Sequence, residues 1–443
     1  MPGKSRTIPS GAWRLIVLEF WERFSYYGIL AILVLFLTSP ERVGGFGWTD
    51  SHALDLLSKF TAAAFMLPTV GGYVADRWLG ARLAVLIGSC LLVVGNVVIA
   101  ASALWLERAS LRASATGAEW ALYAGLVCVA LGNGFFKSSL ITLLGNLIPD
   151  DDVARDRAFR YYYQSIMLGA LAAALCVGFL AEAAGWWSGF AFAALGMAIS
   201  WAIFLIGPAS FPAPHHGITR ASAALPAMPD GPSQSCAVPD IAILCAFLPI
   251  ITIGWVQFQG LWLIEMDRSV DRTVGAFTVP APWLLAVNAI AIVLLAPVAG
   301  RMWRRLARRG ESVPGFTAQL ASAFAIMGCA HLLMAVGFRN AVPGGVSLLW
   351  PVGCLLMITA AEAIFWPSSY NAIHRIAPPR LKSMVMGIWL AMLGLGQYFT
   401  HQVARLAEVL GFSALSVCIG VAMLLSCIVL GVVARLRPAL RAV

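Results

Sequence analysis

The chain has 443 residues, of which 60% are hydrophobic and only 12% are charged, and its mean hydropathy is +0.83. This composition lies outside the range of soluble globular domains. A net charge of +9 would suggest nucleic acid as the partner of a soluble protein, but here the basic residues are distributed among loops. We therefore expect an integral membrane protein with the lipid bilayer as its surroundings and no nucleic-acid partner.

Apolar runs recur along the whole chain, and each is long enough, at roughly 20 residues, to cross a hydrocarbon core about 30 Å thick as a helix. The first run carries charges, is too long for a signal-peptide core and lacks a small-residue cleavage site, so we expect it to stay in the mature protein. Twelve spanning helices are predicted, at 12–38, 52–75, 82–105, 120–146, 160–182, 187–207, 239–264, 282–302, 314–337, 345–371, 383–405 and 412–435.

Basic residues fall in alternate loops, which by the positive-inside rule places those loops and both termini in the cytoplasm. The Ala- and Arg-rich composition is compatible with a bacterium, and hence with the cytoplasmic membrane. Arg108, Arg112, Arg268 and Arg272 are exceptions on the opposite side. The basic loop residues are Arg77, Arg82, Arg155 to Arg160, Arg301, Arg304, Arg305, Arg308, Arg309, Arg375, Arg380, Lys382, Arg435, Arg437 and Arg441.

A single long polar segment divides the chain into two halves of six helices each. The predicted boundaries are an N-terminal half at 1–207, a cytoplasmic linker at 208–238 and a C-terminal half at 239–443. The motif "GGYVADR" after the second helix is weakly similar to "APVAGR" after the eighth, which is the second helix of the second half. Six-helix halves around a central cavity are the usual plan of major facilitator transporters, so we predict that all-α membrane fold.

The turn after the second helix, "GGYVADRWLGAR", supports this prediction. It fits the G-x-x-x-D-R-x-x-G-x-R pattern typical of the major facilitator loop between helices two and three, and the alternative is an ordinary charged turn. Its glycines allow a tight turn, and its aspartate is placed to pair with an arginine at a helix end. This motif indicates a fold and a gating loop rather than a substrate. Its residues are Gly72, Asp76, Arg77, Gly80 and Arg82.

The stretch "LEFWERFSYYG" places three charges inside the first predicted membrane helix. Glu19, Glu22, Arg23, Tyr26 and Tyr27 are spaced i, i+3, i+4, i+7 and i+8, so they share one helix face. Because an ionisable residue at the bilayer centre costs about 2.5–3.5 kcal/mol on insertion scales, this face must meet protein or water. We expect it to line a cavity.

Two further charges stand in otherwise apolar helices, Lys137 on the fourth and Glu362 on the tenth. These helices are equivalent in a fold of six plus six, so a salt bridge between the two residues would satisfy both. Such a pair either holds the halves together or acts as a switch that a proton or a ligand's charge can break. Lys59 and His331 are placed nearer the helix ends, where we assign them no role.

The sequence contains no pattern that predicts catalysis or a cofactor. Its nine cysteines form no C-x-x-C pair or His/Cys cluster, so no metal site is expected. H-E-x-x-H, G-x-S-x-G and phosphate-binding glycine loops are also missing from the sequence, which argues against an enzyme. A transporter-like sensor remains open as an alternative.

Several of these motifs resemble the proton-coupled oligopeptide transporters of the major facilitator superfamily. "EFWERFSYYG" is similar to the family's E-x-x-E-R-F-x-Y-Y-G signature, "GNGFFKSS" and "DDDVARDRAFRYYYQSIMLGAL" to its helix four and five block, and "PAPWLLAVNAIAIVLLAPVAG" to its helix eight. "EAIFWP" and "RLKSMVMGIWLAMLGLGQYF" resemble helices ten and eleven. The similarity runs discontinuously from about residue 15 to 400.

This resemblance implies a proton-driven symporter of di- or tripeptides, with the proton gradient as driving force and no cofactor. It implies proton coupling through Glu19, Glu22, Arg23 and Glu362. Lys137 would receive the peptide carboxylate and pair with Glu362, while Asn288 and Glu362 would receive the amine. Tyr26, Tyr27 and Trp389 would line the pocket. We expect the protein to function as a monomer that binds a small-molecule substrate.

The chain departs from the family where polar groups are usual. Leu30 stands in place of an arginine, Phe65 of a pocket tyrosine, and Met167 of an asparagine. In helix seven, Phe258 stands where the family normally has a glutamate, followed by Leu261 and Trp262 in place of small hydroxyl residues. Losing buried hydrogen-bonding groups makes a site reject ligands that need them. The alternative is therefore a transporter, not necessarily proton-coupled, of a less polar compound such as a modified amino acid or natural product.

Overall fold

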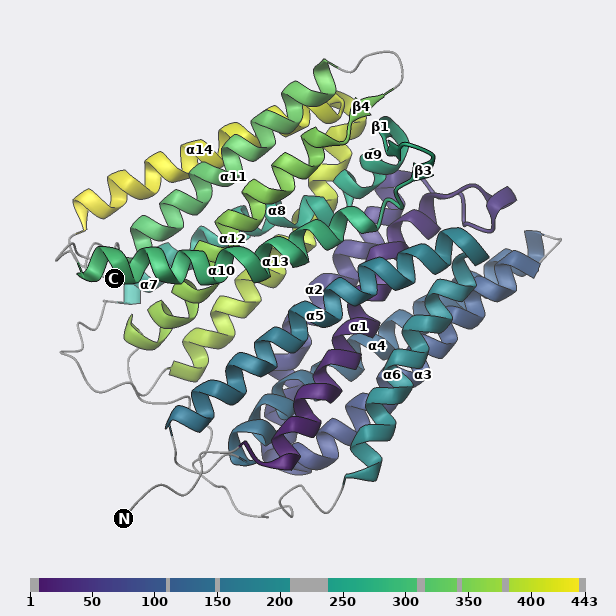
Figure 1. Cartoon of the computed structure of the whole chain (residues 1–443), viewed down its shortest axis with the longest axis horizontal. Coiled ribbons are helices and arrows are strands. Elements are labelled where there is room, and N and C mark those ends of the chain that lie inside the picture. Colours follow the sequence, from purple (N-terminus) through teal and green to yellow (C-terminus); the bar gives the residue numbers. More distant parts are fainter. Residues whose placement is uncertain are drawn as a thin grey trace. The chain divides into compact units, whose positions relative to one another are not determined.

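The structure is a computed structural model, and it describes residues 8–108, 112–147, 152–207, 238–308, 315–340, 345–376 and 382–437. The described chain is almost entirely helical (Figure 1), which confirms the prediction of an all-α protein. It divides into two compact units. Unit 1 comprises Met1–Thr49 and Phe60–Met228, and unit 2 comprises Asp50–Lys59 and Pro229–Val443. The first ten residues of one helix, α2, therefore group with unit 2.

Unit 1 is built from long helices joined by short connections. The π-helical turn Ala75–Leu79 extends α2, and the 3-10 turn Glu41–Val43 precedes it. The helices are α1 (Ser10–Thr38), α2 (Asp50–Val74, from Phe60 onward), α3 (Ala81–Arg108), α4 (Arg112–Leu147), α5 (Asp152–Ala184) and α6 (Trp186–Ile206).

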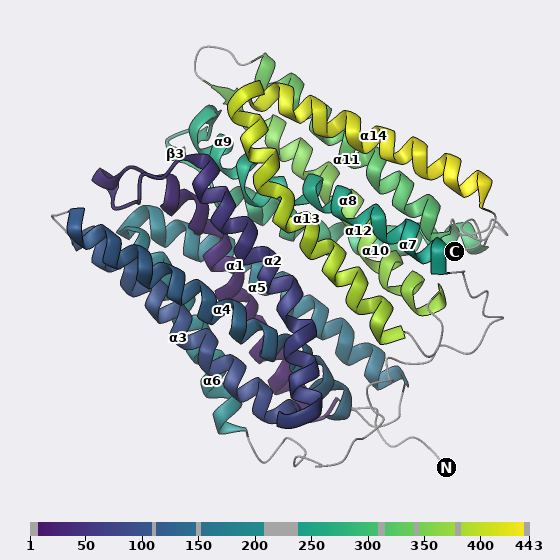
Figure 2. The same ribbon diagram turned by 180° about the vertical axis from the view of Figure 1, so that it is seen from behind.

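The core of unit 1 lies between α1, α5 and α6 and along the α3–α4 pair. Helices α3 and α4 make the most extensive contact and lie side by side in Figure 2, and the Ser102 hydroxyl of α3 donates to the Ala118 carbonyl of α4 at 2.6 Å. Helix α1 packs on α5 and α6, and its apolar residues from Ile29 to Leu37 are buried. Because α1 is enclosed on several sides, its charged residues must be satisfied inside the unit.

In the part of unit 2 that the structure describes, eight helices follow the start of α2 and are accompanied by two small strand pairs. The strands β1 (Val270–Asp271) and β4 (Val346–Ser347) pair in parallel, and β2 (Thr273–Val274) pairs antiparallel with β3 (Phe277–Thr278). Helix α11 packs on α14 and α12, α10 on α12, and α8 on α13. The helices are α7 (Val238–Ala246), α8 (Leu248–Val256), α9 (Leu261–Ser269), α10 (Trp283–Arg308), α11 (Phe316–Arg339), α12 (Leu349–Ile376), α13 (Lys382–Leu410) and α14 (Phe412–Leu436).

The predicted span at 239–264 falls within one candidate membrane-crossing segment, Asp240–Ser269, but this segment is subdivided into α7, α8, a 3-10 turn at Gln257–Gln259 and α9. Pro249 lies in the first turn of α8 and has no N–H to donate back to the preceding turn. Gly260 precedes α9 with φ −127° and ψ −99°, far from helical values. The two interruptions separate the short helix α8 from α7 and α9.

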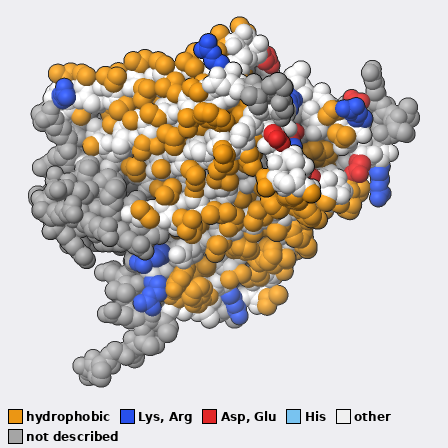
Figure 3. All heavy atoms as spheres, turned by 45° about the horizontal axis from the view of Figure 1, so that its top comes forward, with side chains coloured by type: hydrophobic (Ala, Val, Ile, Leu, Met, Phe, Trp, Pro, Cys, Tyr) orange, Lys and Arg blue, Asp and Glu red, His pale blue; other side chains and the backbone are white. Residues whose placement is uncertain are grey.

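The surface of the described helices fits a lipid environment. Ten helices among the described residues are long and apolar enough to cross a membrane, and Trp283–Leu295 is a shorter apolar segment. The full count of twelve stays a prediction. On the face shown in Figure 3, hydrophobic side chains are spread widely over the described surface, while most charged side chains lie toward its margins. On α14 the large exposed apolar residues are Val417, Val421, Leu425, Ile428, Val429, Val432 and Leu436.

Candidate functional site

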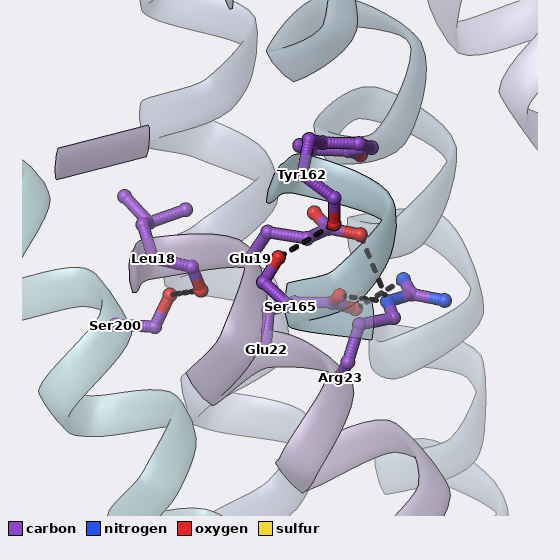
Figure 4. A network of polar contacts seen from close by, with 7 residues as sticks. All are labelled: Leu18, Glu19, Glu22, Arg23, Tyr162, Ser165 and Ser200. Atoms are coloured by element: carbon purple, nitrogen blue, oxygen red, sulfur yellow. Dashed lines mark hydrogen bonds and ion pairs between the residues drawn. The ribbon is translucent and has the colours of Figure 1, made fainter. Parts of the chain in front are cut away.

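Three charged residues of α1 form a buried cluster in unit 1 (Figure 4). Arg23 donates to both oxygens of Glu22, from Nε to Oε2 at 2.5 Å and from Nη2 to Oε1 at 2.7 Å. Its Nε also lies 3.2 Å from Glu19 Oε1. The side chains of Glu19, Glu22 and Arg23 are at most 3% exposed. The predicted shared face is confirmed for these three charged residues, which are buried. The cavity that this face is expected to line stays a prediction.

Glu19 has a different environment from Glu22. Neither of its oxygens has a hydrogen bond of ordinary geometry to a described residue, although Tyr162 of α5 lies beside it in Figure 4. Lys137 of α4 lies within electrostatic range of all three charged residues of α1. The buried cluster therefore contains two carboxylates and two cations, with Arg23 held firmly by Glu22 and Glu19 held less firmly.

Aromatic rings sit against both cations of this cluster. The Arg23 guanidinium carbon is 5.1 Å from the centre of the Tyr26 ring, and Lys137 Nζ is 5.3 Å from the centre of the Phe65 ring. Both distances suit a cation–π interaction. Tyr26 is buried and contacts Tyr27, which is partly exposed, and Phe60. Phe65 thus places an aromatic ring beside Lys137, as the tyrosine usual in the family would, but it lacks the tyrosine hydroxyl.

Close helix packing fixes the position of the α1 charges. A Cβ on Gly169 of α5 would lie 2.6 Å from the Phe20 carbonyl oxygen and 3.0 Å from Arg23 Cβ, so only glycine allows α5 to approach so closely. On the other side of α1, the Ser200 hydroxyl of α6 donates to the Leu18 carbonyl at 2.8 Å (Figure 4). Helix α1 is held on both sides at its charged residues, since Leu18 and Phe20 flank Glu19 and Gly169 packs against Arg23 itself.

Unit 2 buries a carboxylate in another way. Asn288 of α10 donates through its Nδ2 to Glu362 Oε2 at 3.0 Å and to Thr359 Oγ1 at 2.9 Å, both on α12. The Thr359 hydroxyl donates in turn to the Leu355 carbonyl at 2.7 Å. Glu362 is 6% exposed, and its Oε1 has no hydrogen-bond partner among the described residues. The predicted proximity of Asn288 and Glu362 is therefore present in the structure.

The other predicted pocket residues of unit 2 are buried in apolar surroundings. Phe258 lies in the 3-10 turn after α8, with its ring centre 6.2 Å from that of Trp255. Trp389 of α13 is fully buried, and its ring centre lies 5.6 Å from that of Phe316. Trp262 packs at 4.9 Å against His331, whose Nε2 lies 3.0 Å from the Gly254 carbonyl oxygen. His331 is completely buried, eight residues before the end of α11.

The predicted gating loop forms the tight connection between α2 and α3. Asp76 and Arg77 lie in the π-helical turn, and the Arg77 guanidinium sits 5.7 Å from the centre of the Trp78 ring. Gly80 follows with φ +74°, a conformation that glycine adopts without strain, and its N–H donates to the Ala75 carbonyl at 2.7 Å. Gly72 faces Ser138 of α4, and Arg82 is the second residue of α3. Pairing of Asp76 with an arginine stays a prediction.

The predicted bridge between Lys137 and Glu362 joins residues of different units and stays a prediction. Within its own unit, Lys137 lies near the α1 charges instead. Sequence reasoning missed Tyr162 and Thr359, although Thr359 precedes Glu362 by three residues on one helix face and could have been found from that spacing. Lys59, for which no role was predicted, pairs with Asp55 one turn away at 2.6 Å.

Comparison with known proteins decides the family. The family model PTR2, described as the POT family, matches residues 82–220 and 233–417. The chain belongs to the POT family. It is a multi-pass membrane transporter and not an enzyme, which confirms both predictions. The signature motifs quoted above are therefore those of a POT member.

Individual POT relatives resemble the chain over most of its length. It is 29% identical over 451 residues to the peptide transporter YePEPT of Yersinia enterocolitica, covering 86% of this chain and 84% of the relative. It is 26% identical to the di-/tripeptide transporter of Lactococcus lactis, covering 93% of each. A crystal structure of a mutant peptide transporter POT in complex with alafosfalin matches with a TM-score of 0.81 at 24% identity, covering 98% of this chain and 96% of that one. The last match confirms the major facilitator fold.

Proposed function

We propose that this POT member is a proton-coupled symporter of di- or tripeptides, or of small amphoteric compounds that resemble them, and that it works by alternating access. The observation that carries the proposal is the buried charge set. Four charged groups in unit 1 and one buried carboxylate in unit 2 occupy the membrane region, where charges are expensive and are retained for function. The names of the Yersinia and Lactococcus relatives give the same substrate class for those proteins.

Proton coupling would begin at the α1 cluster. Glu19 is the less firmly held carboxylate, since Arg23 makes two hydrogen bonds to Glu22 and only a 3.2 Å ion pair to Glu19. A proton arriving on either carboxylate would weaken its attraction to Arg23. Arg23 and Lys137 would then be left with excess positive charge, which favours binding of a ligand carboxylate nearby. Proton binding would thus be coupled to substrate binding because charges in a site of low dielectric constant must balance one another.

Substrate binding would use both units. Lys137 would receive the carboxylate of the ligand, and Asn288 with Glu362 would receive its amine. A bound ligand would replace the proposed bridge between Lys137 and Glu362. Binding of the substrate and binding of the proton would then each change the free energy difference between the inward-open and outward-open states. In a bacterial host, this transport would take place across the cytoplasmic membrane with both termini in the cytoplasm, and the monomer would be the functional form.

The first test is uptake of radiolabelled dialanine into proteoliposomes, with and without an inward proton gradient. Gradient-dependent accumulation that is lost in both Lys137→Ala and Glu362→Ala supports a peptide symporter. Glu22→Gln tests the proton role separately, and gradient-driven uptake that survives this substitution argues against coupling through the α1 cluster. Exposed Arg42→Ala is the matched control for removal of a charge.

A second candidate function is supported by a separate observation. The rings of Phe65 and Phe258, together with buried Trp262, replace polar groups that the resemblance would place there. A site lined in this way favours a less polar amphoteric compound over a generic peptide. Competition experiments separate the two proposals. Inhibition by ordinary dipeptides at low concentration supports the peptide symporter, whereas inhibition only by compounds with fewer hydrogen-bonding groups supports the second candidate.

A further inference from the structure

His331 is a buried polar side chain of unit 2 that the proposed transport cycle does not use. It lies on α11, is completely buried, and touches two parts of the seventh predicted spanning segment. Its Nε2 lies 3.0 Å from the Gly254 carbonyl oxygen of α8, and its ring centre lies 4.9 Å from that of Trp262 in α9. One side chain of a neighbouring helix therefore contacts this segment on both sides of its interruption at 257–260.

The interruption leaves carbonyl groups of α8 that need partners. An α-helix supplies no internal partner for the carbonyls of its last turn, and α8 ends at Val256. Inside a membrane the protein must satisfy such groups, because lipid tails offer no hydrogen-bond donor. Fully buried Gln257 donates from its Nε2 to the Ile253 carbonyl at 3.1 Å. His331 does the same for the next carbonyl, that of Gly254, and it does so from another helix.

The carbonyl determines which ring nitrogen of His331 carries the hydrogen. A carbonyl oxygen only accepts, so Nε2 must be the nitrogen that donates to Gly254. Nδ1 has no hydrogen-bond partner among the described residues. A charged ring would bury a second N–H without an acceptor, which is costly. The contact therefore suits a neutral imidazole that acts as a hydrogen-bond donor to the end of α8.

Gly254 allows α11 to approach α8 closely. A Cβ at this position would collide with Met423 Cε of α14 and would lie 3.1 Å from Met327 Sδ of α11. Met327 precedes His331 by one turn, so both side chains reach the same part of α8. The hydrogen bond to Gly254 is therefore part of a packed contact among three helices.

The peptide that His331 holds joins Gly254 to Trp255, and Trp255 contacts a predicted site residue. The Trp255 ring centre lies 6.2 Å from that of Phe258. Trp255 and Glu362 also line the same small hollow of unit 2. Because the Gly254 carbonyl belongs to the peptide unit that carries Trp255, displacement of this peptide would displace Trp255 and its contact with Phe258.

We propose that His331 is a positioning residue of the substrate site. Its Nε2–H holds the last turn of α8 and its ring holds Trp262 at the start of α9, so the two parts of the seventh segment keep one orientation around Phe258. His331 acts through these residues and not through contact with the substrate. This inference rests on the proposed role of Phe258 and Glu362 in binding a small amphoteric compound.

Uptake kinetics separate the two contacts of His331. His331→Phe keeps a ring against Trp262 but removes the donor, whereas His331→Gln keeps an amide N–H near the place of Nε2. In His331→Phe we expect the KM for dialanine uptake to rise about tenfold, with Vmax within about twofold of wild type, because a buried carbonyl loses its partner. His331→Gln should recover most of this loss. Met334→Leu, at a fully buried residue one turn away, changes only apolar packing and is the matched control.

The KM distinguishes positioning from a merely structural role. A structural defect lowers the amount of active protein and hence Vmax, while the remaining active protein keeps its KM. An unchanged KM in His331→Phe therefore overturns the proposal, whatever happens to Vmax. Equal rises of KM in His331→Phe and His331→Gln overturn the part that the hydrogen bond plays.

Hydrogen–deuterium exchange in detergent tests the positioning without transport. Mass spectrometry of peptides that cover 248–269 reports how often the backbone N–H groups of this segment open. His331→Phe should raise their exchange rate about tenfold and leave the peptides of α1 as in wild type, while His331→Gln stays close to wild type. Unchanged exchange at 248–269 overturns the proposal. If wild-type protein takes up no dialanine but exchange changes as expected, the proposed symport fails while the role of His331 in holding this segment stands.

Discussion

The two units bury carboxylates in opposite ways. In unit 1, Glu22 is neutralised by two hydrogen bonds from a cation, and Lys137 adds a second positive charge nearby. In unit 2, Glu362 has only a neutral amide as its direct partner among the described residues. A buried ion pair depends on both members, whereas a carboxylate beside an amide can take up a proton without leaving a counter-charge exposed. The two sites therefore suit different steps of a transport cycle.

The largest expected effect comes from breaking the ion pairs of unit 1. Arg23→Met leaves Glu19 and Glu22 buried without their guanidinium, and we expect a loss of about 3–5 kcal/mol in the free energy of unfolding. Chemical unfolding in detergent measures this loss. Arg42→Met, at an exposed arginine, is the control and should change stability little. Combining Arg23→Met with Glu22→Gln should recover part of the loss, and a double variant no more stable than Arg23→Met alone contradicts the pairing.

A smaller effect is expected in unit 2. Asn288→Leu removes the donor to Glu362 and Thr359, and we expect a cost of about 1–3 kcal/mol for the unsatisfied groups. Unfolding of the same kind measures it. The control is Asn96→Leu in unit 1, where the buried amide accepts from Ser25 and donates to the Leu92 carbonyl, both neutral groups. If Asn96→Leu costs more than Asn288→Leu, the amide is not what supports the Glu362 carboxylate.

The sequence predicted the unit 1 site better than the unit 2 site, for physical reasons. Helical spacing alone places Glu19, Glu22 and Arg23 on one face, and the membrane requires that this face meet protein or water in place of lipid. The proximity of Lys137 to them depends on how α4 packs against α1, which periodicity does not encode. In unit 2, the interruptions at Pro249 and Gly260 delimit the separate helix α8, whose Trp255 lines the same hollow as Glu362. Such contacts arise from tertiary packing, so sequence reasoning missed them.

A further prediction concerns the aromatic partner of Lys137. Phe65→Leu keeps an apolar side chain but removes the ring face 5.3 Å from Nζ, and we expect a loss of about 0.5–2 kcal/mol in stability. A double-mutant cycle with Lys137→Met isolates the interaction. Phe60→Leu, whose ring contacts Tyr26 rather than a cation, is the matched control. Additive effects of Phe65→Leu and Lys137→Met would show that the ring contributes only apolar packing.

The smallest effect is expected at an exposed ion pair, and it tests whether burial is what distinguishes the two sites above. Asp50, in the first turn of α2, binds Arg268 of α9 through two hydrogen bonds at 2.6 and 2.7 Å. This pair is bidentate like that of Glu22 and Arg23, although it uses Nη1 and Nη2 in place of Nε and Nη2, and its arginine side chain is 47% exposed. Asp50→Asn should cost only about 0.2–1 kcal/mol and become neutral at high salt, because solvent screens exposed charges. Unfolding at low and high salt measures both. A cost as large as that of Arg23→Met would mean that geometry, rather than burial, sets the strength of ion pairs in this transporter.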